Sequence, residues 1–365
     1  MATFGIEEEF LLVDPATGLP SARAAELAET LSSAAGSGPG VPEPGGSAEF
    51  LACQLEISTD ICETLEEASA SLLDARSAVG AAAAAAGLGL VLSGAAPRVP
   101  DTPAEVSGTE RYQAMGELNG AVTAEHYLNG THVHVAVPDR DAGITALNRL
   151  RPWLSTLAAL AGNSPLWRGR DSSFSSWRLI HYRRWSVQGC PPEFVDAADY
   201  DRRLAMLLET DAVLDAGHIG WAARLSARYP TVEVRVGDAQ LEAGDSLLIG
   251  ALVRGLVDTS VDISGAGVQA PELLDAGLWQ AARYGLGGRL LGILGEPAAA
   301  EDQLAALVAH IRPALEESGD FAYVCTGIER LLRSGTGADR QRAAYASGGW
   351  GGLAQLYEHS LTAPA

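Results

Sequence analysis

Residues 4–13 constrain the fold most, because three consecutive glutamates stand inside an otherwise apolar, strand-like segment. Side chains alternate between the two faces of a β-strand, so Glu7 and Glu9 share one face and Glu8 lies on the other. Two carboxylates on one face of an apolar strand are costly unless they are paired or bound to a metal ion. The segment therefore predicts a metal-binding strand, or an edge strand whose acidic face is solvated.

Residues 131–137 show the same pattern, in which one face of a strand is apolar and the other carries two histidines. His132 and His134 share one face of the expected strand, while three valines share the other. Histidines with this H-x-H spacing are common metal ligands. Two exposed or hydrogen-bonded histidines without a metal would also fit the pattern.

Two further segments place polar side chains on one face of a strand. In residues 231–236, Glu233 and Arg235 face away from three valines, which also fits a cross-strand ion pair on a wet sheet face. In residues 49–58, the polar side chains Gln54, Glu56 and Ser58 share a face, and Glu49 precedes them. Carboxylates and a histidine converging from such strands would hold two or three Mg²⁺ or Mn²⁺ ions, since both ions prefer oxygen ligands.

The chain mixes strands and helices without strict βαβ alternation. Hydrophobic patterning predicts strands at residues 4–13, 49–58, 88–93, 131–137 and 231–236. Helical periodicity predicts helices at residues 23–33, 64–86, 141–160, 200–214 and 247–261, with more helices from residue 271 onward. A Gly/Pro-rich connector covers residues 36–46, and residues 98–125 are rich in loops. We therefore expect an α+β fold with an antiparallel sheet, in a single domain spanning residues 1–365.

The basic residues exclude several kinds of chemistry. All 25 are arginine, so the chain cannot form a lysine-dependent P-loop, a pyridoxal Schiff base, a protein-kinase site or a carbamylated-lysine metal bridge. Any phosphate must be held by arginine, backbone N–H groups or metal ions. The net charge of −21 argues against a nucleic-acid partner.

Cysteine usage and the first residues bear on the compartment. The four cysteines form no C-x-x-C pair, which is typical of free thiols in a reducing cytoplasm. The chain opens on a charged strand without a signal-peptide pattern, and its Ala-rich run is too short to cross a bilayer. We expect a cytoplasmic protein without a membrane partner.

Several motifs in order resemble the carboxylate–amine ligases of the glutamate–cysteine ligase type 2 family. They are Gly-Ile-Glu-Glu-Glu-Phe at 5–10, Gln-Leu-Glu-Ile-Ser-Thr at 54–59, His-Val-His-Val at 132–135, Asn-Arg-Leu-Arg-Pro-Trp-Leu at 148–154, Asn-Ser-Pro-Leu-Trp-Arg-Gly-Arg-Asp at 163–171 and Arg-Tyr-Pro-Thr-Val-Glu-Val-Arg at 228–235. The resemblance covers nearly the whole chain. It implies a fold similar to the catalytic domain of glutamine synthetase, with an antiparallel sheet shaped as a funnel or half-barrel and flanked by helices.

The resemblance also implies an activity and a set of partners. These are ATP-dependent amide-bond formation through an acyl phosphate, with ADP and phosphate released. ATP is the cosubstrate and Mg²⁺ or Mn²⁺ the cofactor. The partners are a small carboxylic acid and an amine, as in glutamate–cysteine ligase, and the assembly is a homodimer.

The resemblance assigns roles to individual residues as well. Glu7 would join His132 and Glu233 at the metal on the ATP side, and Glu9 would join Glu49 and Glu56 at the other metal. His134 would lie near the phosphates, and Arg235 would stabilise the transferring phosphoryl group together with Glu233 and Arg228 as catalytic residues. Candidates for holding ATP phosphates or a carboxylate are Arg168, Arg170, Arg178 and Arg228. Candidates for the substrate pocket are Asn129, Gly130, Trp167 and Trp185.

Two other functions stay open on the sequence. An H-x-H motif with downstream carboxylates also occurs in metal-dependent hydrolases of the amidohydrolase type, although the lack of lysine disfavours their bridged two-metal form. A relative that only binds a metabolite is the third alternative. The retained glutamates and histidines favour the ligase.

Overall fold

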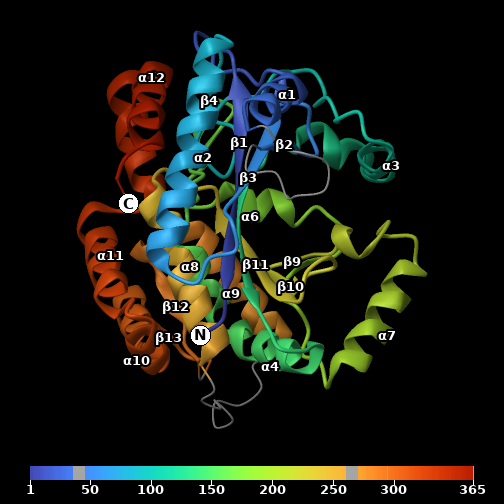
Figure 1. Cartoon of the computed structure of the whole chain (residues 1–365), viewed down its shortest axis with the longest axis vertical. Coiled ribbons are helices and arrows are strands. Elements are labelled where there is room, and N and C mark those ends of the chain that lie inside the picture. Colours follow the sequence, from blue (N-terminus) through green and yellow to red (C-terminus); the bar gives the residue numbers. More distant parts are fainter. Residues whose placement is uncertain (36–45, 260–269, 294, 365) are drawn as a thin grey trace.

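A seven-stranded sheet organises the computed structural model, which describes residues 1–35, 46–259, 270–293 and 295–364 (Figure 1). The strand order is β10-β11-β5-β1-β3-β2, and β4 pairs with the end of β1. The strands are β1 (Phe4–Val13), β2 (Ser47–Ala48), β3 (Gln54–Ser58), β4 (Gly89–Val91), β5 (Gly130–Ala136), β10 (Ala223–Leu225) and β11 (Thr231–Asp238). All their pairings are antiparallel, which confirms the predicted α+β class.

Helices and three short strand pairs surround this sheet. The helices are α1 (Ala24–Ala35), α2 (Leu65–Ala85), α3 (Glu110–Asn119), α4 (Arg140–Leu150), α5 (Leu154–Leu160), α6 (Trp177–Tyr182), α7 (Ala197–Leu208), α8 (Ala243–Asp258), α9 (Pro271–Tyr284), α10 (Ala300–Ser318), α11 (Phe321–Ser334) and α12 (Gly337–Leu361). The pairs join β6 (Leu166–Trp167) to β7 (Arg170–Asp171), β8 (Gln188–Gly189) to β9 (Gly220–Trp221), and β12 (Arg289–Leu291) to β13 (Pro297–Ala299). In Figure 1, α10, α11 and α12 lie along one side of the molecule, and α3 and α7 on the opposite side.

One face of β1 belongs to the core and packs against α2 and α8 (Figure 1). Phe4, Ile6 and Phe10 are at most 2% exposed on this face. Helix α8 comes close because Gly250 lacks a side chain, since a Cβ there would lie 3.0 Å from Ile6 Cδ1. The core therefore fixes the position of β1, and with it the opposite face of the strand.

Glu8 lies on the core face and is neutralised there. Arg76 of α2 donates two hydrogen bonds of 2.7 Å to its two carboxylate oxygens, and Ser246 of α8 donates another. Arg76 also donates to the backbone carbonyls of Gln240 and Leu241. Both charged side chains are at most 1% exposed, so this ion pair ties β1 to α2, to α8 and to the chain after β11.

The structure differs from the expected elements where the sequence places a turn or a proline. Residues 49–58 form only the strand β3 after a turn, not one continuous strand. The helix expected at 141–160 is split into α4 and α5 by a 3₁₀ helix over Arg151–Trp153, because Pro152 cannot donate a helical hydrogen bond. The helix expected at 200–214 is α7, which begins at the N-cap Asp196 and ends earlier.

Other expectations fall on loops or outside the described residues. The loop-rich stretch 98–125 contains the helix α3, whose N-cap Thr109 accepts a hydrogen bond from the backbone of Tyr112. The last residues of the helix expected at 247–261 and most of the connector at 36–46 lie outside the described residues. No helix in the described part of the chain combines the length and apolarity that crossing a bilayer requires.

Replacing Arg76 tests whether the buried ion pair holds β1 in place. Arg76→Ala leaves the buried Glu8 carboxylate without its cation, so we expect about 3–5 kcal/mol lower free energy of unfolding in urea. The control Arg312→Ala removes an exposed pair with Glu316 and should cost no more than about 0.5 kcal/mol. Equal costs for the two variants would contradict this role for Arg76.

Candidate active site

The second face of β1 carries the predicted metal ligands because of the strand register. In the pairing of β1 with β5, Glu7 lies opposite His132, and in the pairing with β3, Glu9 lies opposite Glu56. One strand further along the sheet, Glu233 of β11 lies opposite His134. Directly opposed residues project from the same face of a sheet. The three pairings therefore gather these side chains on one polar face.

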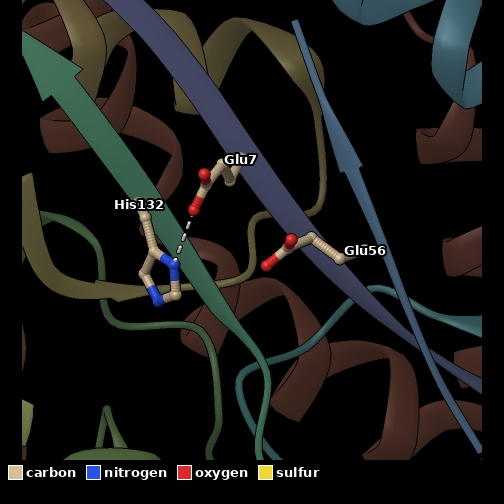
Figure 2. A group of neighbouring side chains, drawn as sticks. All are labelled: Glu7, Glu56 and His132. Atoms are coloured by element: carbon tan, nitrogen blue, oxygen red, sulfur yellow. Dashed lines mark hydrogen bonds and ion pairs between the residues drawn. The ribbon is translucent and has the colours of Figure 1, made fainter. Parts of the chain in front are cut away.

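Glu7, Glu56 and His132 form a first group of ligand atoms, all within 4.8 Å of one another. Figure 2 shows Glu7 and His132 pointing toward each other from β1 and β5, with Glu56 reaching toward them from β3. Nδ1 of His132 lies 3.2 Å from Oε2 of Glu7. Nε2 of His132 is buried and makes no hydrogen bond with any described residue. A buried imidazole nitrogen without a partner is what a metal site would use.

Glu7, His134 and Glu233 form a second group within the same limit. Nε2 of His134 lies 3.3 Å from Oε1 of Glu7, and its Nδ1 lies 3.0 Å from the hydroxyl of Thr231. Glu7 belongs to both groups, so two cations held here would share this carboxylate.

The resemblance pairs these residues differently. It places His132 with Glu7 and Glu233, whereas the structure groups His132 with Glu7 and Glu56, and His134 with Glu7 and Glu233. The reason is the register of β5, in which His134 opposes Glu233 and His132 opposes Glu7. Which of these side chains bind an ion stays a prediction.

Glu9 and Glu49 extend the acidic surface toward a cavity. Glu9 accepts a 2.6 Å hydrogen bond from the backbone N–H of Gly130, and Glu49 accepts one of 2.6 Å from the hydroxyl of Tyr112 on α3. A Cβ at Gly130 would lie 2.5 Å from a guanidinium nitrogen of Arg178 and 2.9 Å from Nε2 of His132. Position 130 therefore requires glycine, because other residues would displace the groups around it.

Mutual repulsion and burial shift the pKa values of this acidic cluster. Burial, followed by the charge of Glu49, raises the pKa of Glu9 to about 7. Burial and neighbouring carboxylates raise the pKa of Glu56 well above its ordinary value. Burial also raises the pKa of Glu49, although Tyr112 and Arg235 oppose the shift. Such a cluster favours a divalent cation, which would offset the charge that burial makes costly.

The pKa values of Glu7 and His132 shift downward, in the opposite direction to that of Glu9. Burial alone would raise the pKa of Glu7, but hydrogen bonds with His132 and His134 outweigh it and leave the pKa below its ordinary value. Burial, together with the charge of Arg235, lowers the pKa of His132 to about 4. A carboxylate and a neutral imidazole are the protonation states that bind metals.

Glu233 is held by two arginines. Nε of Arg224 on β10 donates to it over 2.8 Å, and Arg235 donates to its other oxygen. Burial opposes ionisation of Glu233, yet the charges of Arg235 and Arg224 hold its pKa well below its usual range. Arg235 also lies 3.4 Å from Nδ1 of His132, so it reaches across the metal-ligand face.

A cavity opens beside the acidic cluster and contains the two arginines best placed for an anion. Its empty volume, including the open mouth, is about 590 Å³. Arg178 and Arg235 line it, and Nε of each is buried without a hydrogen-bond partner among the described residues. The remaining wall is mainly aromatic or acidic, and includes Glu9, Glu49, Phe50, Tyr112, His126, Tyr182 and Trp185.

Among the expected substrate residues, Trp185 lines this cavity and donates a 2.9 Å hydrogen bond to Nδ1 of His126. Gly130 lies against Arg178, as described above. Asn129 is fully buried, and Trp167 packs on the ring of His181 with 4.3 Å between centroids; neither lines the cavity.

Three of the expected anion-binding arginines are exposed and do not line this cavity. Arg168 forms a surface ion pair with Glu125, and Arg170 and Arg228 are exposed. Their assignment to ATP phosphates stays a prediction from the resemblance.

Four residues of the site were not identified from the sequence. Tyr112 lies on a helix that the loop-rich composition hides, and Arg224 lies on a strand of only three residues. Tyr182 and His126 have no motif of their own and enter the site through packing. The one available signal was Arg224, since a basic residue between apolar neighbours often marks a buried partner for an acid.

Solved ligase structures share the fold at low sequence identity. Glutamate–cysteine ligase from Francisella tularensis in complex with AMP matches with a TM-score of 0.71 and 13% identity, covering 99% of this chain and 89% of that one. The bifunctional glutathione synthetase from Pasteurella multocida gives 0.68 and 17%, covering 99% of this chain but 52% of the enzyme, so this chain spans about half its length. The ligase PafA, in its complex with the prokaryotic ubiquitin-like protein Pup, gives 0.58 and 15%, covering 97% of this chain and 72% of that one.

Sequence relatives extend over nearly the whole chain. "Putative glutamate--cysteine ligase 2-1" from Nocardia farcinica is 41% identical over 349 residues, which is 94% of this chain and 88% of the relative. "Putative glutamate--cysteine ligase 2-2" from Saccharopolyspora erythraea is 40% identical over 356 residues, covering 95% and 89%. The sequence model described as "Glutamate-cysteine ligase family 2" matches residues 3–359. The chain therefore belongs to glutamate–cysteine ligase family 2.

Proposed function

We propose that this protein is an ATP-dependent carboxylate–amine ligase of the glutamate–cysteine ligase type. The observation that carries the proposal is the polar sheet face, where paired carboxylates and imidazoles adjoin a cavity lined by Arg178 and Arg235, whose Nε atoms have no hydrogen-bond partner among the described residues. In a chain of this family without lysine, these are the groups available to hold a triphosphate.

Divalent cations fit the donor set of this face. Carboxylate oxygens outnumber imidazole nitrogens, which favours Mg²⁺ or Mn²⁺ over Zn²⁺. We propose that Glu7, Glu56, His132, His134 and Glu233 hold these ions, with Glu9 and Glu49 beside them. When bound, the ions would supply positive charge to the phosphate oxygens of ATP.

The reaction needs an activated acid because oxide is a poor leaving group. Transfer of the γ-phosphoryl group from ATP to the carboxylate gives an acyl phosphate and ADP; the amine then attacks its carbonyl carbon, and phosphate leaves. The guanidinium groups of Arg235 and Arg178 face the cavity with unused donors, so they would stabilise charge on the transferring group. Arg224 holds Glu233, and Glu233 in turn accepts a hydrogen bond from Arg235 and so orients it.

The cavity wall would receive the acid and the amine. Tyr112 orients Glu49, and Trp185 with His126 forms an aromatic side that excludes water from the acyl phosphate. The family match favours glutamate and cysteine as the substrates to test first. It also favours the ligase over the metal-dependent hydrolase and the non-catalytic binding protein.

The proposal also covers the shape of the sheet, the number of domains, the compartment and the oligomeric state. We propose that the sheet serves as the funnel of a glutamine-synthetase-like catalytic domain, and that residues 1–365 act as one domain; the continuous buried core supports this. We also propose a cytoplasmic homodimer, on the strength of the four free cysteines and of the commonness of two-fold homodimers.

An assay of ADP release tests the activity. With Mg²⁺ and ATP, release should require both an acid and an amine, starting with glutamate and cysteine. Glu7→Gln, Glu9→Gln and Glu233→Gln should each lower kcat by about 10²-fold or more, since Glu7 and Glu233 would hold the ions and Glu9 lies beside them at the cavity. The control Glu26→Gln removes an exposed carboxylate and should leave kcat unchanged. Release independent of the amine, or full activity in any of the three variants, would contradict the proposal.

Arg235→Lys separates phosphoryl-group stabilisation from simple charge. A lysine keeps the charge but loses the planar fork that spans Glu233 and the cavity, so kcat should fall by about 10²-fold or more with normal circular dichroism. The control is Arg312→Lys on the surface, with unchanged kcat. Full activity of Arg235→Lys would show that Arg235 serves only the ion pair with Glu233.

The pH dependence of stability tests the acidic cluster without turnover. The folded-state pKa of Glu9, about 7, exceeds its ordinary 4.5, so the folded protein holds an extra proton between these values. Stability present below pH 4.5 is therefore lost as the pH rises to 7, by up to about 1.4 kcal/mol per pH unit for this group.

Chemical denaturation in EDTA at pH 5.5 and 7.5 measures this loss. Glu9→Gln should reduce it, and Mg²⁺ at 100 times its dissociation constant should add about 2.7 kcal/mol at pH 7.5. Buried histidines with a lowered pKa, such as His132, add stability over the same pH range, so the loss due to Glu9 is the difference between the wild type and Glu9→Gln. An equal change in stability between the two pH values in both proteins, or a metal-free protein indifferent to Mg²⁺, would refute the assignment.

A further inference from the structure

Arg178 is a buried cation that makes no ion pair with any residue in the described part of the chain. It is 3% exposed on α6, and its guanidinium lies over the ring of Tyr182, 5.2 Å from the centroid. It donates one 3.2 Å hydrogen bond to the backbone carbonyl of Arg235. Because no carboxylate holds its side chain, the place of Arg178 in the cavity depends on where α6 begins.

Two serine hydroxyls hold the beginning of α6. Ser176 is the N-cap and accepts a hydrogen bond of 3.2 Å from the backbone N–H of Leu179. Ser164, which lies on a separate segment before β6, accepts one of 3.0 Å from the backbone N–H of Arg178 itself. A six-residue helix has few internal hydrogen bonds, so contacts at its start matter for its position. The backbone of Trp177 and Ser176 donates to the carbonyls of Ser164 and Ala282, and the two serine hydroxyls add the contacts to the N–H groups of Arg178 and Leu179.

Asp238 orients both serines. Its two oxygens accept hydrogen bonds of 2.8 Å from Ser176 and 2.7 Å from Ser164, and the backbone N–H of Asn163 donates a further one of 2.8 Å. Each serine proton is thereby committed to the carboxylate, and its lone pairs are left for the helix N–H groups. Asp238 is 1% exposed, and its carboxylate makes no direct contact with the metal-ligand groups.

The strand that carries Asp238 also carries Arg235, another arginine of the cavity. Asp238 ends β11, three residues after Arg235, and the register of β11 on β5 shifts between Val234 and Gly237. The irregularity lets Arg235 face the cavity while Asp238 reaches α6. Strand β11 therefore carries Arg235 directly and, through Asp238 and the two serines, also positions Arg178 on α6.

We propose that Asp238 is a positioning residue of the ligase, which places Arg178 in the active-site cavity through Ser164 and Ser176; the inference rests on the function proposed above. Its effect on catalysis passes through Arg178, so it should disappear when Arg178 is absent. A residue that only stabilises the fold would not show this dependence.

Asp238→Asn breaks the arrangement with little change in volume. The carboxylate of Asp238 accepts three hydrogen bonds on its two oxygens. The amide of asparagine has only one oxygen, and its NH₂ group would face a hydrogen-bond donor. Ser164→Ala is the second variant, since it removes the acceptor for the N–H of Arg178 together with one of the three donors to Asp238, and leaves Ser176 in place. The matched control is Tyr357→Phe, which removes a 2.8 Å hydrogen bond to Gln341 in the same buried network; Gln341 donates to Asn163, away from α6.

Hydrogen exchange of the backbone amides at the start of α6 tests the structural part of this proposal without any substrate. The amide of Arg178 should exchange about tenfold faster or more in both Asp238→Asn and Ser164→Ala, and the amide of Leu179 in Asp238→Asn; both should exchange at the wild-type rate in Tyr357→Phe. Unchanged exchange at these two amides in both test variants would overturn the positioning role.

A double-mutant cycle then tests whether the effect of Asp238 on kcat/KM depends on Arg178. Asp238→Asn should lower kcat/KM for ADP release by about tenfold or more in the wild-type background, and by less than about twofold in Arg178→Ala. Equal losses in both backgrounds would show that Asp238 acts independently of Arg178 and would overturn the proposal. A wild-type protein that releases no ADP would contradict the proposed function instead, while the exchange experiment would still decide the geometry.

Discussion

The antiparallel register of β1 with β3 and β5 determines what the site contains. Because Glu7 opposes His132 and Glu9 opposes Glu56, acids and imidazoles from three separate parts of the chain project from one face. A shift of either neighbouring strand by one residue would turn its ligands to the core face. The buried Glu8–Arg76 pair and the apolar side chains beside it oppose such a shift on the other face.

The charge of the site is balanced from its edges. Arg224 and Arg235 compensate Glu233, and hydrogen bonds with the two histidines lower the pKa of Glu7, whereas Glu9, Glu49 and Glu56 have raised pKa values. Glu9 and Glu49 line the cavity that contains Arg178 and Arg235. Cations on one side and arginines on the other would hold a triphosphate without any lysine.

Alternation along strands was enough to predict the metal-ligand face. Glu7, Glu9, His132 and Glu233 were placed on the correct face from residue type and spacing alone, because a period of two is local information. Which side chains lie opposite one another was not local: His134 rather than His132 lies opposite Glu233, because of the register between β5 and β11. Tyr112 and Trp185 meet at one cavity from distant segments, and no spacing in the sequence encodes that meeting.

Patterns spread over the whole chain predicted the fold and the family. They did not predict which arginines lie at the cavity. Arg168, Arg170 and Arg178 stand in motifs of similar appearance, yet only Arg178 is buried at the cavity. Its place depends on the Asp238 network, which joins residues more than 60 positions apart.

The most direct test is a crystal structure with Mn²⁺ and a non-hydrolysable ATP analogue, with the ions located by anomalous diffraction. The account predicts one Mn²⁺ bound by Glu7, Glu56 and His132, and a second bound by Glu7, His134 and Glu233. Mn²⁺ bound elsewhere, or absent from this face while the analogue is bound, would contradict it.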